Sequence, residues 1–233
     1  MRKGYLQILL LSDTTFGRGD GVAGLVDAEV QHDEYGLPYL GGRALKGMLA
    51  AESADLLSAL KKSLPSHEFD LWNETEDWLF GKSGAALMDE ANLRISAARL
   101  PEDLRLALAH EVQQKKLKRE EILETLTTLR RQTAMDAASG APKKEALRTS
   151  RVILRNLVFE AALDFAVEPP AFALPWLAAC VKAFRHAGTG RNRGRGLIHA
   201  ELLNENRKTE PEYFQTFKEK ISPQQKISPE VGV

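Results

Sequence analysis

The sequence has 233 residues, of which 43% are hydrophobic, 32 are lysine or arginine and 32 are aspartate or glutamate, so its formal net charge is zero. A chain of this length can bury a substantial core in one large domain or two small ones. The zero net charge excludes a protein held to nucleic acid by overall basicity alone, so any such binding depends on local patches of charge.

Cysteine usage and apolar patterns narrow the class of protein further. The single cysteine, Cys180, excludes a disulfide framework or a cysteine-based zinc site within one chain. No apolar run reaches the roughly 18 residues of a membrane span, and the amino terminus shows a strand pattern without a signal-type cleavage site. We therefore expect a soluble globular protein of the cytoplasm with no membrane partner.

The first hundred residues predict two strands and one long helix. Residues 5–11, YLQILLL, form a short apolar run between turn residues, which is typical of a buried strand. A glycine-rich loop over 15–24 follows, and apolar residues at helical spacing then predict an amphipathic helix over 43–62. Residues 66–78 carry five acidic side chains and are interpreted as an acidic excursion. Alternation in ANLRISAARL predicts the second strand over 92–100.

The rest of the chain predicts two more strands and two helices. Pro101 suits the first turn of a helix, and the charged segment that it opens predicts a helix over 101–129 that projects from the core. Residues 133–156 mix small and basic side chains without periodicity, which is typical of a long loop or hairpin that touches something acidic. Clear alternation predicts a strand over 157–167, and a helix over 174–187 and a last strand over 196–203 follow.

In chain order these elements run strand, helix, strand, strand, helix, strand, which is the order of ferredoxin-like folds and of RNA-recognition folds. We therefore predict an α+β protein with a ferredoxin-like (RRM-like) βαββαβ core in one domain over residues 1–203. Long insertions at about 66–91 and 101–156 interrupt this core. Beyond Asn204 the composition becomes polar and contains prolines, so residues 204–233 are predicted as a tail. Topology alone does not define a function.

One short stretch, GTGRNRGRG at residues 188–196, places three arginines among four glycines. It follows a helix and precedes a strand, and its glycines are spaced GxGxxxG, so it does not match the dinucleotide-binding fingerprint. One interpretation is an ordinary glycine turn with solvated arginines. The other is a phosphate-binding loop, because glycines let a backbone approach a ligand closely and guanidinium groups bind phosphate oxygens in pairs.

Two aspartates, Asp27 and Asp33, lie in the turn-rich region before the first helix. Either can stabilise a turn by hydrogen bonding to its own backbone. A carboxylate in such a loop can instead hold a hydrated divalent cation against a phosphodiester. The five histidines are scattered without metal-ligand spacing, which favours core, surface or loop roles for them. The sequence alone leaves both roles of the aspartates open.

Four stretches together resemble the RAMP superfamily of CRISPR-associated proteins, and within it the RNA-binding backbone subunits of type III effector complexes. They are the segment GLVDAEVQHDEYGLPYLGGRALKGML at 24–49, Leu79-Phe80-Gly81, the TAMDAASGAPKKEAL region at 133–147 and the loop at 188–196. The order of the four also agrees with the family. One departure is that Gly41-Gly42 replaces the family's Pro-Gly pair and Arg43 replaces the small polar residue after it, a change that a permissive glycine tolerates.

The resemblance implies a protein that holds a CRISPR guide RNA along its backbone, with target RNA and other effector subunits as further partners. It also implies that the 133–147 region forms a thumb-like hairpin that wedges between guide and target bases. The residues that we predict to bind RNA are Arg18, Arg43, Lys46, Lys143, Lys144, Arg148, Gly188, Gly190, Arg191, Asn192, Arg193, Gly194 and Arg195.

In slicing members of the family, an aspartate after the first strand promotes metal-dependent cleavage of target RNA, and Asp27 matches its position. The resemblance thus implies a catalytic and metal-binding role for Asp27 with Mg²⁺ or Mn²⁺. Other members bind without cleaving, so a non-catalytic capping subunit on the 5′ handle of the guide is an alternative. A guide-processing endonuclease is a third reading that the sequence favours less, because only His32 approaches the position of a general acid or base.

Overall fold

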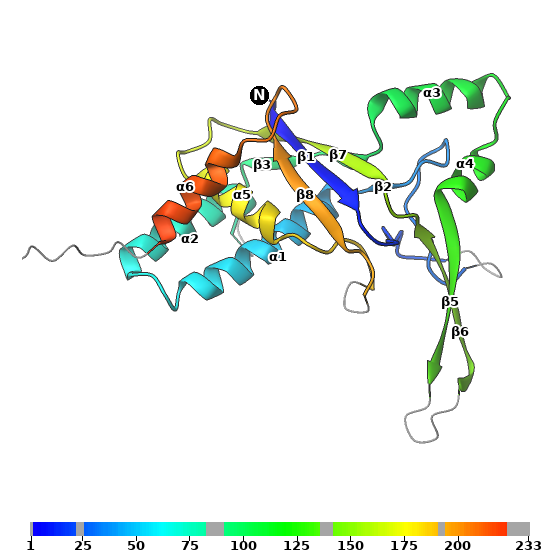
Figure 1. Cartoon of the computed structure of the whole chain (residues 1–233), viewed down its shortest axis with the longest axis horizontal. Coiled ribbons are helices and arrows are strands. Elements are labelled where there is room, and N and C mark those ends of the chain that lie inside the picture. Colours follow the sequence, from blue (N-terminus) through cyan, green and yellow to red (C-terminus); the bar gives the residue numbers. More distant parts are fainter. Residues whose placement is uncertain (1, 22–25, 83–90, 136–141, 191–193, 223–233) are drawn as a thin grey trace, which may run out of the picture.

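The computed structural model describes residues 2–21, 26–82, 91–135, 142–190 and 194–222 (Figure 1). The fold is mixed α/β and is built on an antiparallel sheet of six strands in the order β2-β4-β7-β1-β8, with β3 paired to β7. The strands of this sheet are β1 (Arg2–Leu10), β2 (Tyr39–Leu40), β3 (Leu93–Ile95), β4 (Ala98–Arg99), β7 (Val158–Phe165) and β8 (Ile198–Leu203). The expected strands over 5–11, 157–167 and 196–203 are confirmed with shifted ends.

Alternation along the central strands separates a buried face from an exposed one. In β1 the side chains of Leu6, Ile8 and Leu10 are fully buried, whereas Tyr5 and Gln7 lie on the opposite face. Four helices cover the buried face: α1 (Gly42–Leu60), α2 (Ser66–Phe80), α5 (Ala173–Ala183) and α6 (Pro211–Ile221) (Figure 1). We call the opposite side, marked by Tyr5, Gln7 and Glu160, the open face.

The acidic stretch at 66–78 is not an excursion, because it forms helix α2. Its buried positions Trp72, Thr75 and Leu79 recur three and four residues apart and face the core, while the acidic side chains lie on the solvent side. The Trp72 ring stacks on Trp176 of α5 at 5.3 Å between centroids. The prediction failed because it considered the number of acidic residues and not the helical spacing of the apolar residues between them.

The prediction of a tail over 204–233 also fails for part of that segment. Helix α6 packs against α5, and its Phe217 is buried in contact with Trp72 at 5.3 Å and Trp176 at 5.8 Å between ring centroids. Pro211 opens the helix at a position where its missing N–H costs nothing. The few aromatic residues of an otherwise polar segment therefore complete the core.

The predicted helix over 101–129 is instead two helices, α3 (Glu102–Gln113) and α4 (Arg119–Leu126). The chain breaks between them at Lys115, whose φ of 58° lies in the left-handed region. No residue of α3 is buried, and Figure 1 shows α3 standing apart from the helical layer, as expected for a projecting segment. The expected strand over 92–100 is likewise divided at Ser96, whose hydroxyl accepts a hydrogen bond from the Ala162 N–H at 2.7 Å.

The basic region before β7 forms a hairpin of its own. Strands β5 (Thr127–Met135) and β6 (Pro142–Ile153) pair antiparallel and project away from the main sheet (Figure 1). The interpretation of 133–156 as a hairpin is thus confirmed, although the pairing begins earlier, at Thr127. None of the helices in the described ranges combines the length and the hydropathy that a bilayer span needs.

Candidate functional site

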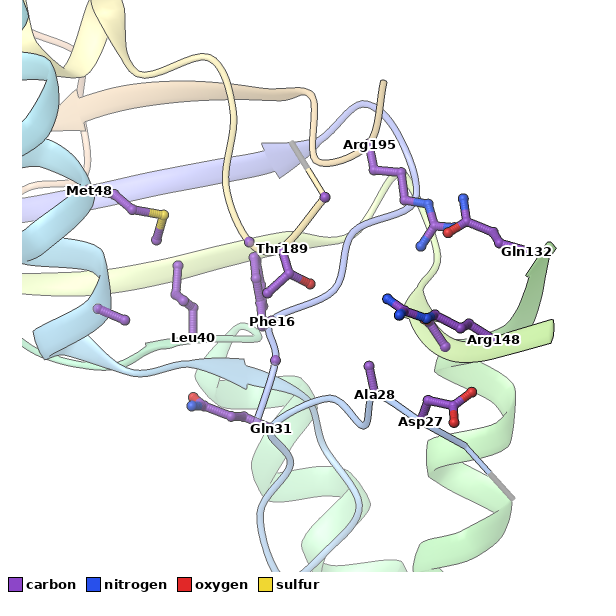
Figure 2. A pocket seen from close by; sticks show the side chains of 15 residues that line it. Phe16, Asp27, Ala28, Gln31, Leu40, Met48, Gln132, Arg148, Thr189 and Arg195 are labelled. Carbon is purple, nitrogen blue, oxygen red and sulfur yellow. The ribbon is translucent and has the colours of Figure 1, made fainter. Parts of the chain in front are cut away.

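A cleft of about 890 Å³ lies where the β5–β6 hairpin, the glycine-rich loop and the start of α1 meet (Figure 2). We call it the hairpin cleft. Phe16, Leu40 and Met48 provide an apolar lining. Polar side chains complete the lining, and these are Asp27, Gln31, Gln132, Arg148, Ser150, Thr189 and Arg195. The cleft therefore combines a largely buried apolar wall with two guanidinium groups and one carboxylate.

The glycine-rich loop is held against the segment that follows β1. The Thr189 N–H donates to the Thr15 carbonyl at 2.9 Å, and Gly188 has a φ of 83° with no space for a side chain, because a Cβ would lie 2.4 Å from that carbonyl. Gly196 is equally constrained, since a Cβ at its φ of 72° would lie 2.1 Å from the Ala187 carbonyl. These two glycines fix the two ends of the loop in place.

The glycines nearer the tip of the loop differ from those at its ends. Gly190 and Gly194 also have a φ of 75°, yet a Cβ would meet nothing closer than 3.8 Å at Gly190 and nothing within 4 Å at Gly194. Gly188, Gly190 and Arg195 line the hairpin cleft. The predicted Arg191, Asn192 and Arg193 lie outside the described residues.

Asp27 lies in the cleft on a segment that is paired with the hairpin. Its carboxylate Oδ2 accepts a hydrogen bond from the Thr149 N–H at 2.6 Å, and its own N–H donates to the Thr149 carbonyl at 2.8 Å. A parallel bridge between Ala28 and Ser150 continues this pairing. Asp27 and Arg148, which are far apart in the sequence, thereby line one cleft (Figure 2).

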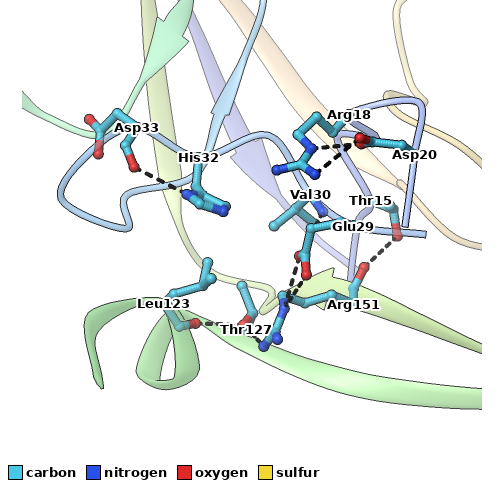
Figure 3. Close-up of polar contacts among 10 residues, drawn as sticks. All are labelled: Thr15, Arg18, Asp20, Glu29, Val30, His32, Asp33, Leu123, Thr127 and Arg151. Atoms are coloured by element: carbon cyan, nitrogen blue, oxygen red, sulfur yellow. Dashed lines mark hydrogen bonds and ion pairs between the residues drawn. The ribbon is translucent and has the colours of Figure 1, made fainter. Parts of the chain in front are cut away.

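A buried ion pair fastens the base of the hairpin to the Asp27 segment (Figure 3). Arg151 Nε lies 2.9 Å from Glu29 Oε1, and only 10% and 3% of the two side chains are exposed. Arg151 also donates from Nη1 to Thr127 Oγ1 at 3.2 Å, and the Val30 N–H donates to Glu29 at 2.9 Å. With their hydrogen bonds satisfied, these charges act as a rigid joint.

Sequence reasoning missed Glu29 and Arg151. The two residues are 122 positions apart, and neither belongs to a local pattern that marks a buried charge. The pair could have been predicted only from the contact between the β5–β6 hairpin and the loop after β1, which the sequence does not show.

The start of α1 explains the Gly41-Gly42 pair. A Cβ on Gly42 would lie 2.1 Å from the Ile95 carbonyl, so a glycine is needed there for the helix to approach β3. The N-cap residue Gly41 has no side chain to cap this amino end, although its own N–H donates to Gln31 Oε1 at 3.2 Å. Ala44 and Met48 of the first turns line the hairpin cleft. Arg43 is exposed in the same first turn. The positive end of the helix dipole therefore lies beside the cleft.

Other predicted RNA-binding residues lie elsewhere or in undescribed places. Lys46 does not line the cleft, because its ammonium donates to the Leu93 carbonyl at 2.8 Å. Arg18 also lies outside the lining, and its guanidinium bonds Asp20 at 2.6 and 3.1 Å, which raises the pKa of Arg18. Lys143 and Lys144 belong to β6, but their side chains lie outside the described part.

Asp33 and His32 have turn roles in the structure. One Asp33 carboxylate oxygen accepts the N–H groups of Tyr35 at 3.0 Å and Leu37 at 3.1 Å, which is the turn-stabilising interpretation. His32 lies with Nδ1 3.1 Å from the Asp33 carbonyl. Within the described ranges, no three histidine, cysteine, aspartate or glutamate side chains gather as a metal site would require.

Comparison with known proteins gives one family and a shared fold. The model of the RAMP superfamily matches residues 7–199. A chain of the type III-B Cmr-beta bound to cognate target RNA, solved by cryo-EM, superimposes with a TM-score of 0.61 at 12% identity, covering 87% of this chain and 97% of that one. A chain of type III-B Cmr-beta in the apo state gives 0.59 at 13% identity, covering 88% and 98%. No curated protein sequence matches the chain.

Proposed function

The chain belongs to the RAMP superfamily, and from this premise we propose that it binds RNA in the hairpin cleft as a subunit of a type III CRISPR effector complex. The observation that carries the proposal is the meeting of Arg148, Arg195 and the amino end of α1 at one cleft. Three chain segments far apart in sequence supply these groups, and all three suit a phosphate backbone.

The topology supports a ferredoxin-like core for this subunit. The strands β8, β1, β7 and β3 lie side by side in that order. Helix α1 follows β1, and α5 follows β7, and both cover the same face. This is the strand order expected when two βαβ units are interleaved. On this view α2, α3, α4 and the β5–β6 hairpin are additions to the core.

The composition of the cleft suits an RNA strand bound mainly by its backbone. Within the described residues no ion pair involves Arg148 or Arg195, so both guanidinium groups are available for phosphates. Met48 is partly exposed at the cleft and offers apolar surface to a ribose or base, whereas Phe16 and Leu40 are buried behind the lining. We propose that the strand is the guide RNA, and that the projecting hairpin lies between guide and target bases with neighbouring subunits on either side.

The test is RNA binding by the full chain with paired substitutions. Replacing Arg148 and Arg195 together with glutamine should weaken binding of a fluorescein-labelled single-stranded RNA about 10- to 100-fold at low salt, measured by anisotropy. A matched control replaces Arg99 and Arg207 on the open face, which removes the same charge and should change affinity little. Equal losses in the two double variants would show binding by net charge and remove the cleft from the proposal.

A second function, cleavage of bound target RNA, is favoured by the position of Asp27. One carboxylate oxygen is held by the Thr149 N–H, and the side chain lines the hairpin cleft, so the other oxygen can serve as a cation ligand there. A single carboxylate together with RNA phosphate oxygens and water suits Mg²⁺, which rarely requires a cage of protein ligands. Bound there, Mg²⁺ or Mn²⁺ would stabilise the charge that develops as a 2′-hydroxyl attacks its phosphodiester.

Cleavage is tested on the assembled complex with Asp27→Asn. This change keeps an oxygen that can accept the Thr149 N–H but lowers the affinity for a cation, so target cleavage should fall while RNA affinity is kept. Retention of cleavage at the wild-type rate would contradict the catalytic role and leave a binding subunit. An intact complex that binds target and never cleaves it, with or without Mg²⁺, would instead favour the non-catalytic capping role.

A further inference from the structure

A second hollow, of about 630 Å³, lies at the base of the hairpin and shares Arg195 with the hairpin cleft. We call it the base pocket. Its charged lining residues are Asp13, Arg130, Arg155 and Arg195. They come from the segment after β1, from β5, from the turn after β6 and from the glycine-rich loop. Four parts of the chain thus place charged side chains around one pocket, and of these four charged residues the sequence analysis predicted only Arg195 to bind RNA.

The same face of the hairpin lines both hollows. Arg130 stands opposite Ser150 in the β5–β6 register, and Gln132 stands opposite Arg148. Because alternate residues of a strand point to one side, these four side chains share a face of the hairpin. Arg130 lines the base pocket while the other three line the hairpin cleft. The two hollows are therefore neighbours along the hairpin. Arg130 and Gln132, which line one hollow each, are two residues apart on β5, and two residues of a strand span about 6.6 Å.

The charge of the base pocket is strongly unbalanced. Arg130 is engaged by Asp13, whose Oδ2 lies 2.5 Å from Nη2 and 3.2 Å from Nε. The Asp13 carboxylate also accepts the Arg155 N–H at 3.4 Å, so its two oxygens are both occupied. No ion pair involves the side chain of Arg155 or Arg195 in the described part of the chain. Two guanidinium groups therefore face the pocket without a carboxylate of their own.

From this arrangement we infer that the base pocket is a second phosphate site, in which Arg155 and Arg195 bind the RNA backbone next to the segment held in the hairpin cleft. The inference rests on the proposed RNA binding and extends it around Arg195. Asp13 acts as a positioning residue, since it holds Arg130 and neutralises its charge. The net positive charge of the pocket then comes from Arg155 and Arg195. A guanidinium pair of this kind matches the oxygens of a phosphodiester.

The inference is tested with Arg155→Gln in the full chain, because Arg155 is exposed and lies outside the hairpin cleft. Affinity for single-stranded RNA should fall about fivefold at low salt. The slope of log affinity against log salt should become shallower by about 0.7, the value for one lost phosphate contact on a single strand. Arg155→Lys keeps the charge and should restore the salt slope. Thermal unfolding of each variant checks that the fold is unchanged.

Two further variants separate the failure of this inference from failure of RNA binding in the cleft. Arg148→Gln probes the cleft alone, and Arg207→Gln removes one charge from the open face. Weaker binding with Arg148→Gln but wild-type affinity and slope with Arg155→Gln would overturn the second site and leave the proposed function standing. Wild-type binding in all three variants would overturn both. A loss with Arg155→Gln that Arg207→Gln reproduces would also overturn the site, because it would reflect net charge.

Discussion

The open face of the sheet and the hairpin cleft both display arginines, but they hold them differently. On the open face, Arg207 forms an ion pair with Glu160 and lies over the Tyr5 ring at 4.6 Å. Arg99 lies 3.5 Å from Asp33 and also covers an aromatic ring. A hollow of about 420 Å³ is present there, yet its guanidinium groups already have partners.

In the hairpin cleft the situation is reversed. Arg148 and Arg195 have no carboxylate partner among the described residues, and the nearby charge pair, Glu29 with Arg151, is buried beneath the cleft rather than in it. The comparison shows that a binding surface cannot be recognised by the number of its arginines alone. What matters is whether the fold has already paired them, because a guanidinium bound to a carboxylate has its charge neutralised and fewer N–H donors left for a phosphate.

The largest effect on stability is expected for the buried Glu29–Arg151 pair, which joins the hairpin to the Asp27 segment. Arg151→Met leaves Glu29 buried without its partner, which should lower the free energy of unfolding by about 3–5 kcal/mol. Arg207→Met breaks the Arg207–Glu160 pair on the open face, where the Arg207 side chain is 47% exposed, and should cost about 1 kcal/mol or less. Urea unfolding of both variants measures the difference. Similar losses would mean that the two pairs are equivalent and would break the comparison.

The next effect concerns two glycines of the glycine-rich loop. Gly196→Ala forces a Cβ against the Ala187 carbonyl in a left-handed conformation, and we expect a loss of about 2–3 kcal/mol. Gly194 also has a positive φ, but a Cβ there would meet no atom within 4 Å. Gly194→Ala should therefore cost only the backbone strain, about 1 kcal/mol. Denaturant midpoints distinguish the two. If Gly194→Ala proved the more destabilising change, the loop would be held by contacts other than those at its ends.

A smaller effect should appear in how RNA binding depends on salt and on base identity. Arg148→Gln should weaken binding to oligouridine and oligoadenine by the same factor, because a phosphate contact carries no sequence information. The slope of log affinity against log salt should fall by about 0.7. Arg207→Gln is the control and should leave the slope unchanged. A loss confined to one homopolymer would mean that Arg148 reads bases rather than the backbone.

The sequence predicted the parts of the fold that depend on local pattern. An apolar run located β1, alternation located β7, and helical spacing located α1, while β8 and α5 were also predicted near their observed places. It failed where a few apolar residues are set among many polar ones, as in α2 and α6. In both helices a single buried aromatic side chain, Trp72 or Phe217, joins the core through contacts with distant helices. Composition averages over a segment and so misses such residues.

The site was predictable in its motifs and not in its contacts. The glycine-rich loop and Asp27 were recognisable from their residue types, and the structure brings both to one cleft. Whether a basic residue is available depends on partners far away in the sequence, which no local pattern records. Arg207 illustrates this, because Glu160, whose carboxylate bonds its guanidinium, lies 47 positions away in the sequence.

Lys46 is a further residue whose predicted role depends on its surroundings. The resemblance to the family predicts an ammonium group near RNA phosphates. In the structure the group is half-buried and donates to the Leu93 carbonyl at 2.8 Å. Burial, together with the charge of Arg94, lowers the pKa of Lys46 from its ordinary value of 10.5. The ammonium group is thus committed to a hydrogen bond between α1 and β3, in a place that disfavours its charge, and it has little to offer a ligand.

The smallest effect on RNA binding is therefore expected for Lys46→Met, within about twofold of wild type. Its effect on stability should instead depend on pH. Because the folded protein binds the proton of Lys46 less tightly than the unfolded chain, this residue makes stability rise as the pH increases from the lowered folded value to 10.5. Methionine keeps the apolar stem and removes the titration, so urea midpoints of the variant should rise less over that window. A loss of RNA affinity equal to that of Arg148→Gln would instead assign Lys46 to the interface and would extend the binding surface along α1.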